Sequence, residues 1–164
     1  MDVKNSYIVT QKHKLNILVV DDDKDSRETL MMLLKIRGHN IVGLDEGMKS
    51  VNRCFEKKFD IIFMDYHTND LNGDVNGAEI IATLREIYGT DDVNIYGYTG
   101  DSRKEIINKF KESGATGILI KPVSANLINE IISIIEGNAN RINLQKLAMK
   151  NKTHFILCKN TKNK

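Results

Sequence analysis

The chain has 164 residues, of which 41% are hydrophobic and 28% are charged, and its formal net charge at pH 7 is +2. This length suits one compact domain with a real core and is too short for two ordinary domains, which argues against a receptor joined to its effector. The composition is that of a globular protein, and no apolar run approaches the ~20 residues that cross a bilayer, so the sequence excludes wholesale disorder and a membrane-spanning segment.

The N-terminus and the cysteines indicate a compartment. No basic region followed by an apolar run opens the chain, so we expect no secretory signal. The two cysteines, Cys54 and Cys158, form neither a CxxC pattern nor a Cys/His metal spacing. We therefore expect two reduced thiols in a cytoplasmic protein.

Residues 15–136 alternate short apolar runs with amphipathic stretches. In chain order, strands are predicted at 15–20, 40–44, 59–64, 93–98 and 117–120, and helices near 26–37, 48–57, 77–88, 101–113 and 124–136. Ser26 is expected to cap the first helix, and Gly38 is expected to end it. Strands that are apolar throughout are typical of a sheet covered on both faces. The sequence therefore predicts an α/β fold with a doubly wound, five-stranded parallel sheet.

Gly137 marks a change in composition. Every charged side chain from there onward is basic, whereas the preceding part of the chain has more acidic than basic side chains: the basic residues are Arg141, Lys146, Lys150, Lys152, Lys159, Lys162 and Lys164. We predict an N-terminal extension at 1–14, the globular domain at 15–136 and a basic tail at 137–164. A solvated, partly helical extension and a functional basic segment fit the tail equally well. The second would bind nucleic acid or an anionic membrane weakly, or dock on its own acidic body.

Polar side chains directly follow four of the five predicted strands. Because the carboxyl ends of parallel strands meet at one edge, where open α/β sheets bind ligands, we expect these side chains to share one crevice. They are Asp21, Asp22 and Asp23 after the first strand, Asp65 after the third, Thr99 after the fourth and Lys121 after the fifth.

Such a set points to phosphoryl transfer on a carboxylate. Carboxylates this close raise one another's pKa values unless a divalent cation or a lysine neutralises them, which predicts a magnesium site with Asp22 and Asp65 as direct ligands. A hydroxyl and an ammonium then remain for the oxygens of the transferred group, with Asp65 as the nucleophile. Each motif alone is ordinary turn or helix-cap chemistry, and only their joint occurrence in this order favours a functional site.

Four segments carry a resemblance to a known family. The runs ILVVDDD at 17–23, IFMD at 62–65, YTG at 98–100 and IKP at 120–122 resemble the receiver domain of two-component response regulators, over about residues 15–136. The resemblance implies a flavodoxin-like fold with strand order 2-1-3-4-5. It also implies that the chain is a signalling receiver, with no enzymatic activity beyond its own phosphorylation and dephosphorylation.

The resemblance assigns a role to each residue of the crevice. Asp65 would be the phosphoacceptor. Mg²⁺ would be bound by Asp22, by Asp65 and by the main-chain carbonyl of His67, while Asp21 would act through a bound water.

Other residues would handle the phosphoryl group or modulate the site. Thr99 would bond a phosphoryl oxygen, and Lys121 would pair with Asp65 and then with that group. The modulating positions are Gly100, Asp101, Ile118 and Pro122; Pro122 follows Lys121 through an expected cis bond, and His67 and Asp101 would set the lifetime of the phosphoryl group.

The resemblance also implies partners. The donor would be a histidine kinase or a histidine phosphotransfer protein, and a downstream protein would bind the surface formed by residues 101–113, 117–120 and 124–136. Homodimerisation is left open.

Three features depart from the family pattern. Asn69 stands where the family has a proline, and Ile118 stands where it commonly has the aromatic residue that turns inward on activation. The loop after Asp65 is four residues too long, with Asn76-Gly77 keeping the register of the next helix. Its additional acids, Asp70 and Asp74, either crowd the metal or face water.

Two alternatives stay open at this point. An aspartyl-nucleophile phosphatase would use Asp21 or Asp23 as its nucleophile and would need a later acidic metal pair, for which Asp101 is the only candidate. A degenerate receiver that binds partners without phosphorylation would fit the altered loop and Ile118.

Overall fold

The computed structural model describes residues 13–70, 73, 75–89, 93–137 and 140–158. Its strands are β1 Asn16–Val20, β2 Asn40–Leu44, β3 Ile61–Met64, β4 Asn94–Thr99, β5 Gly117–Ile120 and β6 Phe155–Leu157. Its helices are α1 Lys24–Ile36, α2 Gly47–Glu56, α3 Gly77–Tyr88, α4 Lys104–Glu112, α5 Ala125–Glu136 and α6 Arg141–Lys150. No helix in these ranges is both long enough and apolar enough to cross a bilayer.

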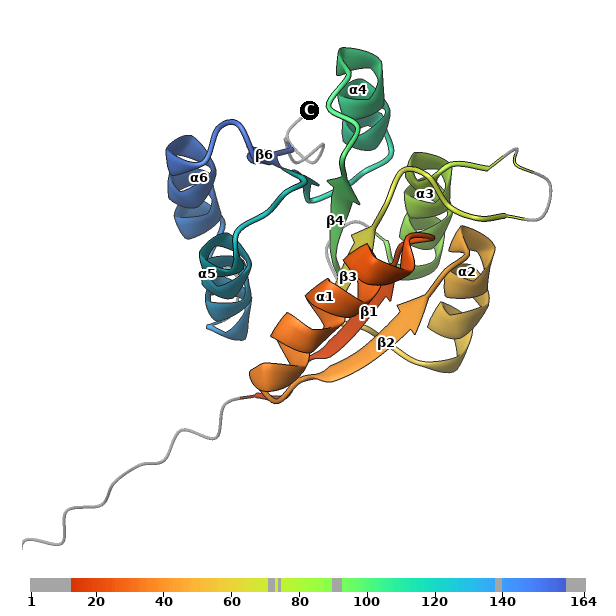
Figure 1. Cartoon of the computed structure of the whole chain (residues 1–164), viewed down its shortest axis with the longest axis horizontal. Helices are drawn as coiled ribbons and strands as arrows, with labels where there is room; N and C mark the ends of the chain where they lie inside the picture. Colours follow the sequence, from red (N-terminus) through yellow and green to blue (C-terminus); the bar gives the residue numbers. More distant parts are fainter. Residues whose placement is uncertain (1–12, 71–72, 74, 90–92, 138–139, 159–164) are drawn as a thin grey trace, which may run out of the picture.

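The sheet has the order β2-β1-β3-β4-β5-β6, and its first five strands in this order are parallel. The predicted doubly wound sheet with order 2-1-3-4-5 is thus confirmed (Figure 1). Val20 at the end of β1 is in register with Met64 at the end of β3, and Thr99 is in register with Ile120. The residues that follow these strands therefore emerge side by side at one edge.

Alternate strand residues enter two apolar cores, one on each face of the sheet. Ile17 and Val19 face a core shared with α1, α5 and α6, whereas Leu18 and Val20 face a core shared with α2, α3 and α4. Because both faces are covered, the central strands are apolar at nearly every position. The two layers of helices hold the strand ends rigidly at the edge where the polar residues lie.

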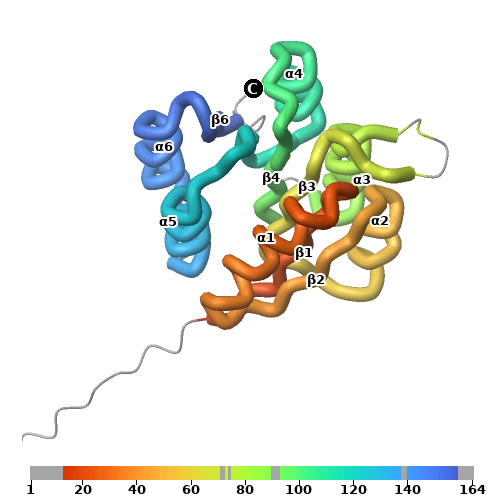
Figure 2. Tube along the Cα trace, viewed as in Figure 1, coloured from red at the N-terminus to blue at the C-terminus, as the bar shows by residue number. Residues whose placement is uncertain are grey.

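The sheet gains a sixth strand beyond the five that the sequence predicts. β6 pairs antiparallel with β5, and α6 packs beside α5 (Figure 2). Phe155 is 1% exposed, and it lies over Gly117, where an added Cβ would come within 2.9 Å of the phenyl ring. Residues 140–158 are therefore built onto the domain. β6 covers the outer edge of β5, whose four residues are buried, so residues 117–120 do not present the edge that a downstream protein was expected to bind.

Two helices begin differently from the sequence prediction. The cap of α1 is Asp23, whose carboxylate accepts a hydrogen bond from the Ser26 N–H at 2.7 Å. The Ser26 hydroxyl donates to the Asp21 carboxylate instead of capping the helix. α4 begins at Lys104, because Asp101 accepts from the main chain of Arg103 before the helix starts. As a result, the Ser26 hydroxyl is available to Asp21, and Asp101 lies before the first turn of α4 instead of inside it.

Candidate functional site

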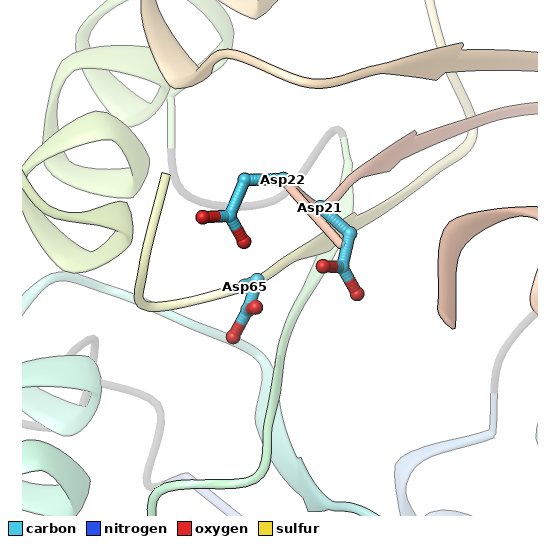
Figure 3. A group of neighbouring side chains, drawn as sticks. All are labelled: Asp21, Asp22 and Asp65. Carbon is cyan, nitrogen blue, oxygen red and sulfur yellow. The ribbon is translucent and has the colours of Figure 1, made fainter. Parts of the chain in front are cut away.

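Three carboxylates meet at the carboxyl edge of the sheet. Asp21 and Asp22 follow β1 and Asp65 follows β3, and one oxygen of each lies within 4.8 Å of the others (Figure 3). Asp21 is fully buried and Asp65 nearly so, whereas Asp22 is exposed. The cluster thus has two members fixed in the protein and one that faces solvent.

Lys121, at the end of β5, supplies one positive charge to this cluster. Its Nζ donates to Asp21 Oδ2 at 2.6 Å and lies 3.5 Å from Asp65 Oδ2. The ammonium also lies 4.9 Å from the ring centroid of Tyr98, a cation–π contact. The Lys121 ammonium thus lies between the two buried acids and can exchange its ion pair from one to the other when their charge changes.

Asp21 is held rigidly by its own surroundings. Oδ1 accepts from the Asp23 N–H at 2.9 Å, while Oδ2 accepts from the Ser26 hydroxyl at 2.7 Å as well as from Lys121. The Arg27 guanidinium donates to the Asp21 main-chain carbonyl at 2.6 Å. Because Asp21 is fully buried and held by three side-chain or main-chain donors, it is suited to orienting its neighbours.

The Asp65 carboxyl is harder to ionise than an exposed aspartate, mainly because it is buried. Burial is the largest influence and raises the pKa of this carboxyl from 3.8 to about 6, Lys121 lowers it, and the neighbouring charge of Asp21 raises it again. Three carboxylates facing one ammonium leave room for a divalent cation. Oxygen-only donors of this kind are the ligands that Mg²⁺ takes, so the residues present fit that ion.

The raised pKa makes a stability prediction for Asp65→Asn. The carboxyl titrates near 3.8 when unfolded and near 6 when folded, so the folded chain binds an additional proton between these values and loses stability as pH rises through them. Without Mg²⁺, we expect Asp65→Asn to increase the free energy of unfolding at pH 7 by roughly 1–3 kcal/mol.

Urea denaturation in EDTA tests this prediction. The difference between Asp65→Asn and the wild type should be largest at pH 7 and should nearly vanish at about pH 3, below both pKa values, where Asp65 is protonated in the folded and in the unfolded chain. A variant that is less stable than the wild type at pH 7 would contradict the electrostatic account of the site.

Thr99 and Asp101 form the β4 side of the site. Thr99 is fully buried, and its hydroxyl oxygen accepts from the Asp101 N–H at 3.1 Å, which leaves its proton for a neighbouring acceptor. The Asp101 carboxylate binds Arg103 at 2.6 Å and lies 3.4 Å from His67 Nε2. Arg103 and His67 thus both contact Asp101, two residues after Thr99.

The loop after Asp65 is anchored at both ends. Tyr66 donates its N–H to Asp65 Oδ1 at 2.7 Å, and Asn76 and Glu79 form a capping box at the start of α3. Gly77 approaches the Asp65 carbonyl so closely that an added Cβ would overlap it. The pair Asn76-Gly77 therefore begins α3, as the register of the sequence indicated.

Of the two additional acids of this loop, Asp70 is described by the structure and Asp74 is not. Asp70 accepts from the Thr68 hydroxyl at 2.6 Å and from the Met48 N–H at 3.0 Å, so its carboxylate turns to the start of α2 and away from the cluster. Asp74 lies outside the described residues. Asn69, in the family's proline position, donates its N–H to the Asp45 carbonyl at 3.4 Å.

The remaining positions for which the resemblance implies a modulating role lie around β4 and β5. The Lys121–Pro122 peptide bond is cis, as the resemblance implies. Gly100 faces open space beside Thr99. Ile118 is fully buried in the core under α4 and is in register with Ile156 of β6.

Sequence reasoning missed two residues of the site. Tyr98 lies under the Lys121 ammonium, and burial raises the pKa of its hydroxyl to about 12, helped by the charges of Asp21 and Asp65. Ser26, taken for a helix cap, instead donates its hydroxyl to Asp21. A tyrosine in an apolar strand and a serine in a first helical turn carry no signal that separates these contacts from ordinary packing and capping.

Comparison with known proteins defines the class. Residues 17–133 match the response regulator receiver domain family. The chain is also 31% identical, over 120 residues, to the transcriptional regulatory protein ZraR of Salmonella typhimurium; the match covers 73% of this chain and 26% of ZraR. The chain therefore belongs to the response regulator receiver family, and it spans about a quarter of the length of this curated relative.

Solved structures have the same fold. A CheY-like receiver domain protein from Methanospirillum hungatei aligns with a TM-score of 0.69 and 18% identity, covering 79% of this chain and 99% of that one. A two-component response regulator from Clostridium difficile aligns with a TM-score of 0.68 and 24% identity, covering 77% and 99%. Together with the full burial of Asp21, family membership does not favour the phosphatase alternative.

Proposed function

We propose that this receiver domain is a phosphorylatable switch in which Asp65 accepts a phosphoryl group from a phosphohistidine of a kinase or phosphotransfer protein. The observation that carries the proposal is the nearly buried Asp65 carboxylate, which shares one oxygen-lined cluster with Asp21 and Asp22 and lies 3.5 Å from the Lys121 ammonium. A carboxylate so placed is both a nucleophile and a metal ligand.

In the proposed step, an Asp65 oxygen forms a bond to phosphorus while the phosphorus–nitrogen bond of the donor breaks, and the imidazole leaves with the electron pair and takes up a proton. Bound Mg²⁺, held by Asp22, Asp65 and the His67 carbonyl with Asp21 acting through a water, would neutralise charge on the phosphoryl oxygens. Lys121 then shifts its ion pair from Asp65 to the phosphoryl group, and Thr99 donates its hydroxyl to another oxygen.

A route for the signal runs from Asp65 to α4. Tyr66 follows the acceptor directly, its hydroxyl accepts from Lys109 Nζ at 3.1 Å, and its ring packs edge-on against Phe110 at 5.7 Å between centroids. This contact supports a switch that does not use an aromatic side chain at Ile118. A movement of Tyr66 on phosphorylation would change the packing of α4 and with it the surface that α4 presents to a downstream protein.

Acetyl phosphate tests the proposal on the whole chain. With Mg²⁺, we expect intact-mass spectrometry to show one added phosphoryl group that survives acid and is lost in base. With EDTA in place of Mg²⁺, the adduct should be absent. An unmodified protein in Mg²⁺, or equal labelling in EDTA, would contradict the proposal.

A further inference from the structure

β6 forms the end of the sheet, and no strand of the described residues pairs with its outer edge. Ile120 donates to the His154 carbonyl at 2.9 Å and Cys158 donates to the Thr116 carbonyl at 3.1 Å, which sets the register of the β5–β6 ladder. In an antiparallel pair the direction of the main-chain groups alternates, so Leu157 turns its N–H and carbonyl away from β5. Neither group has a main-chain partner within the described part of the chain.

A groove of about 520 Å³ runs beside this open edge. α6 forms one wall, with Arg141, Gln145 and Met149, and β6 forms the other, with Ile156 and Leu157. Met149 is 68% exposed although it is apolar. A groove between a helix and an open edge strand is the geometry in which an extended peptide adds a strand to a sheet.

The charge of the groove is of one sign. Arg141 and Lys152 are its charged lining residues, and the sequence has no acidic side chain from Gly137 to the end. Lys111 of α4 adds positive charge nearby, because the charges of Lys111 and Arg141 both act to lower the pKa of the Cys158 thiol, which directly follows β6. A segment that fills the groove favourably would therefore carry acidic side chains.

We propose that the groove between α6 and β6 binds an extended, acidic segment of a partner protein, which pairs with the outer edge of β6 as a further strand. The segment's main chain would bond to Leu157, its apolar side chains would contact Met149 and Ile156, and its carboxylates would pair with Arg141 and Lys152. This surface goes beyond phosphorylation at Asp65 and does not depend on it.

Other occupants fit the groove less well. Residues 159–164 of the chain contain Lys159, Lys162 and Lys164 and no acid, so they have the same sign as the groove. A second copy would bring the same positive charges to its own β6 edge. Nucleic acid would use the charges but would leave the Leu157 main-chain groups and the apolar lining without a partner.

Fluorescence anisotropy on the full, unphosphorylated chain tests the proposal, with a fluorescein-labelled peptide of alternating valine and glutamate as the probe. We expect saturable binding with a Kd below about 1 mM. The double variant Arg141→Glu/Lys152→Glu should weaken binding at least about tenfold. The matched double variant Lys14→Glu/Lys58→Glu, at two exposed lysines outside the groove, should bind as the wild type does.

Two further measurements separate strand addition from attraction between charges. Leu157→Pro removes an N–H that faces outward and keeps the bonds to β5, so it should weaken binding about as much as the double variant while circular dichroism stays unchanged. A probe peptide with alternate amides N-methylated should also bind weakly. No binding, equal binding of the methylated peptide, or tighter binding of a labelled oligothymidylate at the same arginine and lysine would each overturn the proposal.

Discussion

Replacing Asp65 with Asn is expected to abolish labelling of the chain by acetyl phosphate in the presence of Mg²⁺. A carboxamide has no anionic oxygen to attack phosphorus. The other acids of the cluster are poorly placed to take over, because Asp21 is fully buried and Asp22 is exposed, with no ion pair to Lys121 among the described residues. Intact-mass spectrometry of the variant should show only unmodified protein.

The control for this experiment is Asp25→Asn. Asp25 is an exposed acid in the first turn of α1, outside the carboxylate cluster. Its replacement should leave labelling at the wild-type level. Full labelling of Asp65→Asn would mean that the phosphoryl group resides on another side chain, and loss of labelling in both variants would mean that the total charge of the region, and not one nucleophile, governs the reaction.

The second large effect is expected on stability, from Phe155→Ala in β6. The phenyl ring is 1% exposed, packs against Tyr96 at 6.2 Å between centroids and covers Gly117. Removing a buried phenyl ring leaves a cavity and costs about 3–5 kcal/mol. Urea denaturation should therefore show a much lower free energy of unfolding for Phe155→Ala than for the wild type, although Phe155 lies outside the four sequence motifs of the crevice.

Phe55→Ala is the matched control, because Phe55 is 72% exposed on α2. Its replacement should change the free energy of unfolding by no more than about 0.5 kcal/mol. Equal effects of the two substitutions would show that β6 contributes little to the folded domain. A large effect at Phe155 alone would make α6 and β6 part of the cooperative unit that holds Lys121 in place.

The parallel part of the fold follows from the sequence because its signals are strong. Runs such as 17–20 and 61–64 are apolar at every position, and the stretches between them have helical spacing, so the two-sided sheet could be predicted. β6 could not. It is a strand of three residues in a basic segment. It is stabilised by pairing with β5 and by the packing of Phe155 over Gly117, and these are tertiary contacts that a local sequence pattern does not show.

The site was predictable to the same extent and for a related reason. Asp21, Asp65 and Lys121 each follow a strand and Thr99 ends one, so the parallel topology alone brings them to one edge. The contacts that orient them depend on side-chain directions in three dimensions. Ser26 bonds to Asp21 only because Asp23 takes over the helix cap, and Tyr98 of β4 contacts Lys121 at the end of the neighbouring strand β5.

The most direct measurement of the central claim is to locate the phosphoryl group chemically. Sodium borohydride reduces an aspartyl phosphate to homoserine, which marks the acceptor in the peptide sequence. After labelling with acetyl phosphate and Mg²⁺, we predict that tandem mass spectrometry will find homoserine at position 65. Homoserine at position 21, 22 or 23, with unmodified Asp65, would contradict the assignment of the acceptor to the end of β3.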